Sequence, residues 1–326
     1  MSCARRASRG MRGAVRSKLT TAAYRRQPRE QGMRIAVDGR GFVSPPVQFA
    51  LIEGRHLAFR ELGQGEPALL IHGLGGRATN WTDLMHALPL HCHAIDLPGY
   101  GHSDPTPEPP TMAGFVKAVE AFIEQRLDGQ AQHLFGNSMG GVVAVDLAAT
   151  RPDLVRSVTL VSPALPTHRL TRTNYAVPAV ALPHIGARLF ARWQRGTVEQ
   201  RVAGTLAVNF ADPAGVHPLR VQELIEETQR RDGDDHAAST FLGSARSLML
   251  SYLRPRSANP WQRLARIEAP LLVVYGLRDR LVDPMAARRI SREHPGATVA
   301  MIVNTAHVSQ IEAPLEVARL WIEHIG

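Results

Sequence analysis

Cysteine is scarce in this chain of 326 residues, which contains only Cys3 and Cys92. We therefore expect no structural disulfide, as is usual for a protein of a reducing compartment such as the cytoplasm. Long hydrophobic runs are also missing, because no stretch approaches the roughly 20 uninterrupted apolar residues that a membrane-spanning helix needs. These absences predict a cytoplasmic protein without a transmembrane segment.

The excess of positive charge is confined to the first forty residues. The formal net charge is +9, and residues 1–40 hold eleven Arg and Lys against two acids. The rest of the chain is therefore neutral, and its charge gives no reason to expect a nucleic acid partner. Because residues 1–40 have few large apolar side chains, we predict a disordered basic extension. It could be an organelle transit peptide, a segment that contacts acidic surfaces, or sequence upstream of a later start at Met33.

Apolar runs typical of strands alternate with helical patterns over most of the remaining chain. Hydrophobic residues make up 44% of the sequence, which is enough for one large core. The alternation predicts a mainly parallel sheet covered by helices on both faces. We expect an antiparallel hairpin over 47–52 and 56–61, a helix near 112–127, and further strands at 68–71, 93–96, 132–135, 158–161, 271–275 and 297–303.

This strand pattern stops between residues 162 and 260. The interval contains apolar stretches broken by proline and amphipathic helical runs such as 219–230. Nearly a hundred residues are too many for a loop within a compact domain. The interval is therefore predicted to be a helical insertion.

Ser138 lies at a predicted strand-to-helix corner, within the sequence Gly136-Asn137-Ser138-Met139-Gly140. At such a sharp turn the serine hydroxyl is lifted clear of the sheet, and glycine neighbours accommodate the strained backbone. The helix that follows directs its free N–H groups toward negative charge that develops there. Taken alone, the pattern is equally compatible with a glycine-rich corner that carries an incidental serine.

Three other segments accompany this corner in a defined order. The glycine loop that begins with His72-Gly73-Leu74 follows strand 68–71 and precedes Ser138. Asp279 follows strand 271–275, and His307 follows strand 297–303. The order of nucleophile, acid and histidine is that of the α/β-hydrolase fold and differs from that of other serine hydrolase folds.

With these motifs, the chain resembles the α/β-hydrolase superfamily over roughly residues 45–326. It also contains the Asp-x-Pro-Gly-x-Gly-x-Ser loop at 96–103 and Glu312-Ala313-Pro314 before a C-terminal helix. The resemblance implies an α/β-hydrolase fold, with a mostly parallel central sheet flanked by helices and a helical cap insertion. We expect the core at 41–162 and 261–326, and the cap, or lid, at 163–260 above the active site.

Each candidate residue has a chemical role in this interpretation. Ser138 would attack the substrate while His307 takes its proton, and Asp279 would orient the imidazole and stabilise its protonated form. Met139, directly after the nucleophile, would supply one backbone N–H to the oxyanion. The resemblance assigns the second oxyanion donor to Leu74.

Other polar groups have simpler interpretations. Asp283 is an alternative acid, but it lies further from the strand end, before Pro284. His91-Cys92-His93 could suggest a metal site, but adjacent strand residues point to opposite faces and no second ligand pair is apparent at a suitable spacing. The glycine loop after His72 lacks the spacing of a nucleotide-binding motif. We therefore expect neither a metal nor a cofactor.

Hydrolysis of a carboxylic ester is the expected reaction, with a small-molecule acyl or aromatic substrate. The sequence Gly-Asn-Ser-Met-Gly-Gly also resembles the carbon–carbon bond hydrolases that act on ring-fission products. Those enzymes usually have tryptophan after the catalytic histidine, where this chain has Val308, and a glycine-proline oxyanion loop. Acyl transfer and perhydrolysis use the same triad, and a catalytically silent binding protein of this fold is a further alternative.

Substrate choice would depend on the cap. Its apolar residues indicate a pocket for an acyl or aromatic group: Tyr175, Val177, Val180, Leu182, Leu189, Phe190 and Trp193. Arginines of the same region could instead recognise a carboxylate, although arginines on amphipathic helices usually face solvent: Arg192, Arg195 and Arg201.

Overall fold

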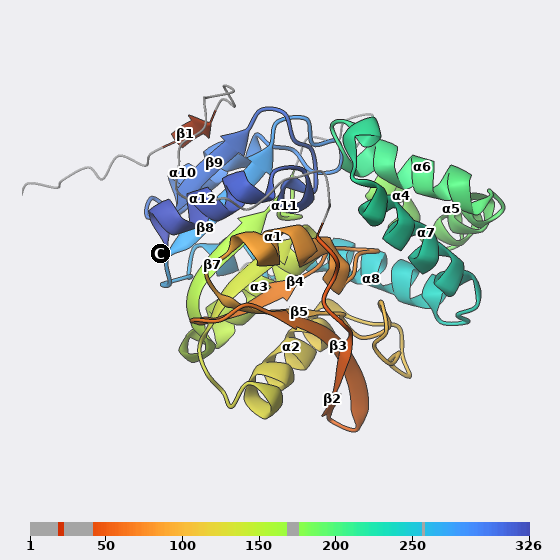
Figure 1. Cartoon of the computed structure of the whole chain (residues 1–326), viewed down its shortest axis with the longest axis horizontal. Coiled ribbons are helices and arrows are strands. Elements are labelled where there is room, and N and C mark those ends of the chain that lie inside the picture. The colour runs from red at the N-terminus through yellow and green to blue at the C-terminus, as the bar shows by residue number, and fades with distance from the viewer. Residues whose placement is uncertain (1–18, 23–41, 168–175, 256–257) are drawn as a thin grey trace, which may run out of the picture.

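A nine-stranded sheet forms the centre of the computed structural model, which describes residues 19–22, 42–167, 176–255 and 258–326 (Figure 1). The strand order is β1-β9-β8-β7-β6-β4-β5-β3-β2. The β2–β3 and β3–β5 pairs are antiparallel, and all other neighbours in the sheet are parallel. The strands are β1 Leu19–Ala22, β2 Gln48–Ile52, β3 Arg55–Leu62, β4 Pro67–Ile71, β5 His91–Ile95, β6 Gln132–Asn137, β7 Val155–Val161, β8 Leu271–Gly276 and β9 Thr298–Ile302.

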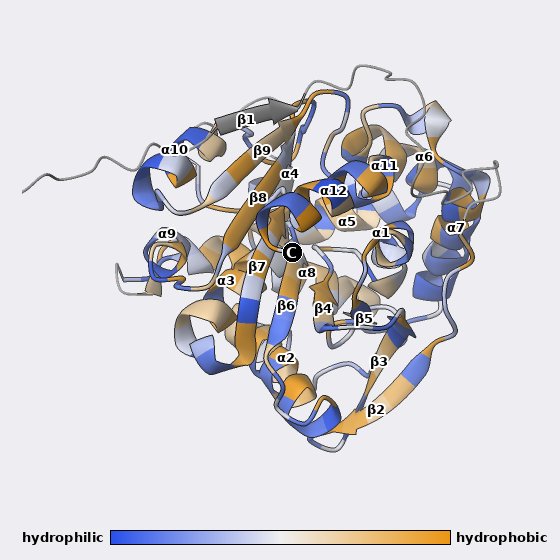
Figure 2. Ribbon diagram, turned by 60° about the vertical axis from the view of Figure 1, so that its left-hand side comes forward, coloured by the Kyte–Doolittle hydropathy of each residue, from blue (hydrophilic) through white to orange (hydrophobic). Residues whose placement is uncertain are grey.

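Helices cover both faces of this sheet. Successive strand residues point to opposite sides, so Leu69 and Ile71 of β4 pack in one cluster with residues of α2, α3, α9 and α10. Ala68 and Leu70 pack in a second cluster with residues of α1 and α12. Burial on both faces explains why a central strand such as β8 is hydrophobic along its length, whereas β6 and β7 also contain hydrophilic residues (Figure 2). These helices are α1 Thr82–Ala87, α2 Met112–Arg126, α3 Met139–Thr150, α9 Pro260–Leu264, α10 Ala286–Glu293, α11 Ser309–Glu312 and α12 Pro314–His324.

The predicted hairpin is present as β2 and β3. Glu53 and Gly54 connect the two strands with φ values of 49° and 78°. Two successive positive φ angles match the right-handed twist of the strands they join, as in the tightest hairpin turns. The expectation of an antiparallel hairpin before the parallel sheet is therefore confirmed.

The N-terminal extension differs from the prediction at four residues. Leu19–Ala22 form β1, which pairs in parallel with β9 at the edge of the sheet, from Leu19 opposite Val299 to Ala22 opposite Ile302. The disorder that its composition suggested does not apply to this strand. The rest of the extension lies outside the described residues.

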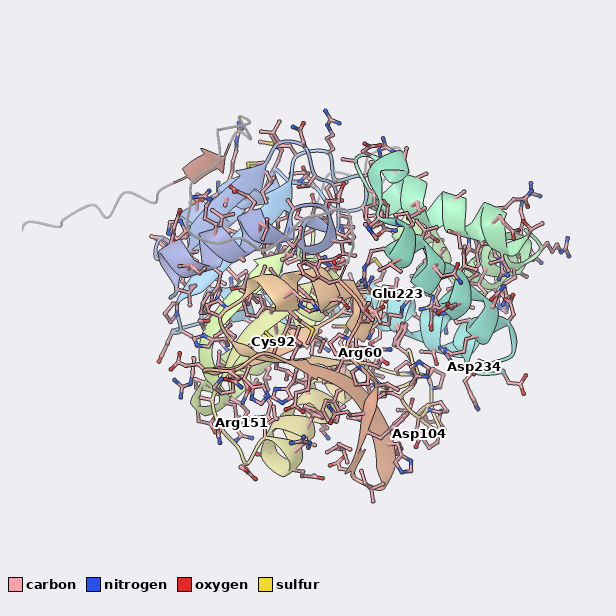
Figure 3. The ribbon with its side chains drawn as sticks, in the orientation of Figure 1. Arg60, Cys92, Asp104, Arg151, Glu223 and Asp234 are labelled. Atoms are coloured by element: carbon pink, nitrogen blue, oxygen red, sulfur yellow. The ribbon has the colours of Figure 1, made fainter. Side chains whose placement is uncertain are left out.

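Five α-helices lie between β7 and α9 in the described residues and form a unit beside the sheet (Figure 1). β7 nevertheless pairs directly with β8, starting with Val158 opposite Leu271, so the sheet is continuous across the insertion. Figure 3 labels Glu223 and Asp234 in this unit. We call it the cap; its helices are α4 Ala176–Ala181, α5 Ile185–Gln194, α6 Val198–Asn209, α7 Pro218–Asp232 and α8 Ala237–Ser251.

Two further features concern membrane-spanning helices and the reactivity of the buried cysteine. In the described parts of the chain, every helix is too short or too polar to cross a lipid bilayer. Cys92 is buried with a free thiol, whose pKa burial raises to about 12. Such a thiol is unreactive at neutral pH.

Candidate active site

Ser138 occupies the corner between β6 and α3 with φ 53° and ψ −115°. This conformation is unusual for a residue with a side chain and is stored strain of the kind found at functional sites. The main chain holds it from both sides. Ser138 N–H donates to the Val161 carbonyl, and its own carbonyl accepts from the N–H groups of Gly141 and Ala164.

Glycine is required on both sides of this corner. A Cβ at Gly136 would lie 2.5 Å from the Gly140 carbonyl oxygen, and a Cβ at Gly140 would lie 2.2 Å from that of Ile71. Real Cβ atoms do not approach main-chain oxygens so closely. The two glycines of the sequence motif therefore allow α3 to start against β4 and β6, which fixes the position of Ser138.

The glycine loop after β4 lies directly against the serine. A Cβ at Gly73 would stand 3.0 Å from Ser138 Cβ, so the main chain directly before Leu74 lies against the nucleophile. Met139 is the first residue of α3, and N–H groups in the first turn of a helix have no partner within the helix. The two residues that the sequence suggested as oxyanion donors thus lie next in the chain to Gly73 and to Ser138, respectively.

His307 and Asp279 form a buried pair at the same end of the sheet. His307 Nδ1 lies 2.9 Å from Asp279 Oδ2, and their side chains are 5% and 0% exposed. Asp279 Oδ1 also accepts the N–H groups of Leu281 and Val282. Burial raises the pKa of Asp279, but the charge and hydrogen bond of His307 outweigh burial, and the net pKa lies below its usual value. A charged Asp279 would keep the proton on His307 Nδ1 and leave Nε2 as the base.

The alternative acid has a different role. Asp283 Oδ1 accepts the N–H of Met285, near the start of α10. The bond caps the turn that leads into this helix. Among the described residues, the carboxylate on His307 is that of Asp279.

Residues that the sequence analysis did not assign hold His307 in place. Asn137 Nδ2 donates to the carbonyls of Val161 and His307, each at 3.0 Å. The N–H of His307 donates to the Asn209 carbonyl in the cap. Glu312 accepts the N–H of Ala306 through one oxygen and that of Ala211 through the other. Asn137, inside the serine motif, and Glu312, in Glu312-Ala313-Pro314, carried a sequence signal, whereas Asn209 carried none.

His72 and Asp96 stabilise the glycine loop and the loop after β5. His72 is fully buried, with Nδ1 2.7 Å from the Gly73 carbonyl and Nε2 accepting the N–H of Leu97. Burial lowers its pKa, so the ring is neutral. Asp96 accepts the N–H groups of Ala78 and His102. Both side chains therefore use their polar atoms inside the protein.

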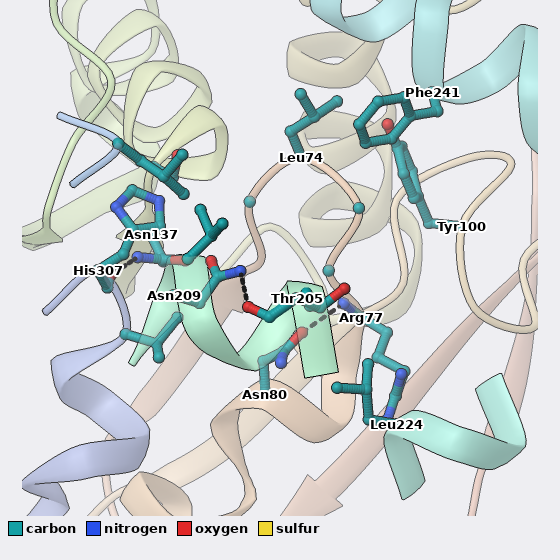
Figure 4. A pocket seen from close by; sticks show the side chains of 18 of the residues that line it. Leu74, Arg77, Asn80, Tyr100, Asn137, Thr205, Asn209, Leu224, Phe241 and His307 are labelled. Atoms are coloured by element: carbon teal, nitrogen blue, oxygen red, sulfur yellow. Dashed lines mark hydrogen bonds between the residues drawn. The ribbon is translucent and has the colours of Figure 1, made fainter. Parts of the chain in front are cut away.

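A cavity of about 660 Å³ lies between this corner and the cap, and Leu74, Ser138 and His307 line it. Figure 4 shows His307 beside Asn137 at one end, and Leu74, Tyr100 and Phe241 grouped at another. Of the cap residues expected to face substrate, Val180, Leu189, Phe190 and Trp193 line the cavity. Leu182 is half exposed instead, and Tyr175 and the Val177 side chain lie outside the described residues.

The three cap arginines that could have recognised a substrate carboxylate lie in surroundings that do not favour this role. Arg201 is 5% exposed and forms a two-point ion pair with Asp232, at 2.6 and 2.5 Å. Its charge is therefore already matched within the cap. Arg192 and Arg195 are exposed, as arginines on amphipathic helices usually are.

Arg231 links the cap to the glycine loop. Its Nη2 donates to the Gly75 carbonyl at 2.7 Å, and its Nε donates to Glu227. Glu227 is 5% exposed and also accepts two hydrogen bonds from Arg230. Burial raises the pKa of Glu227, but Arg230, Arg231 and Arg77 together outweigh burial and hold the pKa at about 2. A charged cluster thus connects α7 to the loop that contains Leu74.

Comparison with known proteins agrees with this architecture. Residues 67–314 match the family model described as alpha/beta hydrolase fold. Over 86% of its length the chain is 31% identical to the dihydrolipoyllysine-residue acetyltransferase component of the acetoin cleaving system of Cupriavidus necator, covering 69% of that protein. It is 25% identical to monoacylglycerol lipase abhd6-A of Xenopus laevis, over 81% of this chain and 76% of that one.

A third relative is the 2-hydroxy-6-oxononadienedioate/2-hydroxy-6-oxononatrienedioate hydrolase of Burkholderia vietnamiensis. It is 26% identical, over 82% of this chain and 90% of the relative. The three relatives have different reactions in their names, so they agree on the family and differ on the chemistry. With its family-model match over most of its length and the corner, loop and strand order described above, this chain belongs to the alpha/beta hydrolase fold family.

Proposed function

We propose that this protein is a serine hydrolase that cleaves a carboxylic ester through Ser138, His307 and Asp279. The observation that carries the proposal is the buried His307–Asp279 pair, 2.9 Å apart, on a cavity that Ser138 also lines. A strained serine, a histidine and a buried carboxylate, each from a different strand end, are the arrangement that acyl transfer to serine requires.

The reaction would proceed in two steps. Ser138 Oγ attacks the ester carbonyl carbon while His307 Nε2 accepts the hydroxyl proton. The N–H groups of Leu74 and Met139 stabilise the negative oxygen of the tetrahedral intermediate. The intermediate collapses to an acyl-serine as His307 returns the proton to the departing alcohol. Water, deprotonated by His307, then releases the carboxylic acid and restores Ser138.

The cap supplies the substrate pocket in this proposal. Aromatic and aliphatic side chains on α5 and α8 face the cavity, among them Phe190, Trp193 and Phe241. Phe190 packs against Phe241 with ring centroids 5.3 Å apart. Such a wall favours an acyl chain or an aromatic group, since each buried methylene stabilises binding by up to about 0.8 kcal/mol.

Acyl transfer is the second candidate, favoured by the 31% identity to an acetyltransferase component. It would use the same acyl-serine, but an alcohol, amine or thiol would replace water in the second step. Carbon–carbon bond hydrolysis has support from the 26% identical relative that is named for it. Val308 after His307, and the loop Gly73-Leu74-Gly75-Gly76, depart from the usual pattern of those enzymes.

A panel of p-nitrophenyl esters of increasing chain length, measured beside a ring-fission dienoate, tests these alternatives. We expect ester turnover that Ser138→Ala abolishes and that the exposed control Ser239→Ala retains. A fluorophosphonate probe should label the protein and the control but not Ser138→Ala. Faster cleavage of the dienoate would replace the ester assignment, and product acylated on an added acceptor would indicate acyl transfer. Absence of both labelling and turnover would refute catalysis.

A further inference from the structure

Glu61, His91 and His93 form a cluster at the opposite end of the sheet from Ser138. His91 begins β5 and His93 lies two residues later, so both rings point to the same face of the strand. Glu61 of β3 lies directly opposite His93 in the antiparallel pairing. Ser138 follows the carboxyl end of β6, whereas the cluster lies near the amino end of β5, so the two sites are separate.

The sequence analysis rejected a metal site here because adjacent strand residues point to opposite faces and no second ligand pair was apparent at a suitable spacing. Cys92, labelled in Figure 3, does point to the other face and packs in the cluster with α1 and α12. The third residue on the histidine side comes from a strand about thirty positions earlier. Its spacing has no motif, and only strand pairing reveals it.

The potential ligand atoms are already close to one another. Glu61 Oε1 lies 2.7 Å from His91 Nε2 and 3.8 Å from His93 Nε2. One ligand atom from each residue lies within 4.8 Å of the other two. In a tetrahedral zinc site with bonds of about 2.0–2.1 Å, ligand atoms stand about 3.4 Å apart. The two distances lie on either side of that value, so each of these two pairs needs a shift below 1 Å.

The carboxylate is oriented for one-point binding. Glu61 Oε1 faces the two histidines, and Oε2 lies 3.5 Å from Arg126 Nη2 at the end of α2. Arg126 is itself held over the Phe59 ring, 5.1 Å from the centroid. A guanidinium on the outer oxygen fixes the carboxylate while the inner oxygen stays directed at the histidines. Partners of this kind orient the ligands in many metal sites.

The burial of the cluster also suits a metal. The side chains of His93, Glu61 and His91 are 3%, 26% and 36% exposed, so the cluster is anchored inside and open to solvent on one side.

We propose that Glu61 Oε1, His91 Nε2 and His93 Nε2 bind a zinc ion, with water at the fourth position on the exposed side. Two imidazoles and a carboxylate suit Zn²⁺, whereas Mg²⁺ and Ca²⁺ prefer oxygen ligands alone. The ion would connect β3 of the antiparallel hairpin to β5 of the parallel sheet. A hydrogen-bonded Glu–His pair without any ion is the competing explanation of this cluster.

Titration of ZnCl₂ into the chelator-treated full-length protein, followed by calorimetry, tests the proposal. We expect one ion per chain at this site, and no comparable signal with MgCl₂. His91→Gln and Glu61→Gln should each weaken this binding at least about tenfold, the lower limit for loss of a group that supports a metal site. His56→Gln is the matched control, because His56 also lies on β3 and beside a carboxylate, that of Asp104 at 3.3 Å.

Stability provides a second measurement. With free zinc at about 100 times the dissociation constant, the unfolding equilibrium constant should fall about 100-fold in wild type and in His56→Gln. It should fall far less in His91→Gln, whose fold is checked by circular dichroism. Equal zinc affinity in wild type, His91→Gln and Glu61→Gln, or no binding at all, would overturn the proposal. Ser138→Ala should bind zinc like wild type, so the result is independent of the proposed hydrolase activity.

Discussion

Replacing Glu227 with glutamine should weaken the connection between the cap and the glycine loop. The variant keeps the size of the side chain but removes the negative charge that faces Arg230 and Arg231. Both arginines would then be left next to a neutral amide, in surroundings where Glu227 itself is only 5% exposed. Removing one partner of a buried ion pair is strongly destabilising for this reason.

The expected loss of stability follows from the pKa of Glu227. A pKa held at about 2, against 4.5 in the unfolded chain, corresponds to about 3 kcal/mol of stability at neutral pH. Because the pKa is lowered in the folded protein, this contribution is complete above pH 4.5 and is lost as the pH falls toward 2. At pH 3 slightly less than half of it should remain.

Urea unfolding followed by tryptophan fluorescence measures this effect at pH 7 and pH 3. Glu226→Gln is the control, since Glu226 is the preceding residue of α7 and is exposed. We expect Glu227→Gln to lower the free energy of unfolding by about 3 kcal/mol at pH 7 and the control by less than about 0.5 kcal/mol. A loss below about 1 kcal/mol, or an equal loss at both pH values, would refute the reasoning.

Asp279→Asn should reduce kcat about 10⁴-fold, because the amide would favour the wrong tautomer of the histidine, whereas Asp283→Asn should stay within several-fold; similar losses in both would contradict the assignment of the acid. Gly140→Ala should destabilise the fold by at least about 1–3 kcal/mol, since its Cβ would lie 2.2 Å from a carbonyl oxygen of β4. Gly204→Ala, in α6 with no atom near the added Cβ, should instead be neutral or stabilising in the same urea experiment. Trp193→Ala should move the preferred ester to a longer acyl chain, and an unchanged chain-length profile would show that Trp193 does not contact substrate.

Much of the fold was predictable because its signals are local. Buried parallel strands are mostly apolar, and the strands from β4 onward were visible from their short apolar runs. The turn of the hairpin is signalled by Gly54, which adopts positive φ without strain. The extension was less predictable, since composition argues for disorder while β1 gains its order from pairing with β9.

The candidate site was predictable to the extent that it is encoded in motifs. Ser138 is recognised from the glycines that its corner requires, which a Cβ at Gly136 or Gly140 would prevent. His307 and Asp279 were inferred because each follows a strand, and parallel strands bring their carboxyl ends to one edge. Their hydrogen bond, 2.9 Å long, joins residues whose separation along the chain has no fixed value.

The sequence by itself determined the family, the strand alternation and the order of serine, acid and histidine, because each depends on near neighbours in the chain. Only the tertiary structure decided which groups surround them. Asn209 reaches the main chain of His307, Arg231 reaches Gly75, and Glu61 reaches His93. These contacts join segments that are distant in sequence, between residues that have no required spacing. Strand pairing and the packing of the cap set them, and neither can be read from a local pattern.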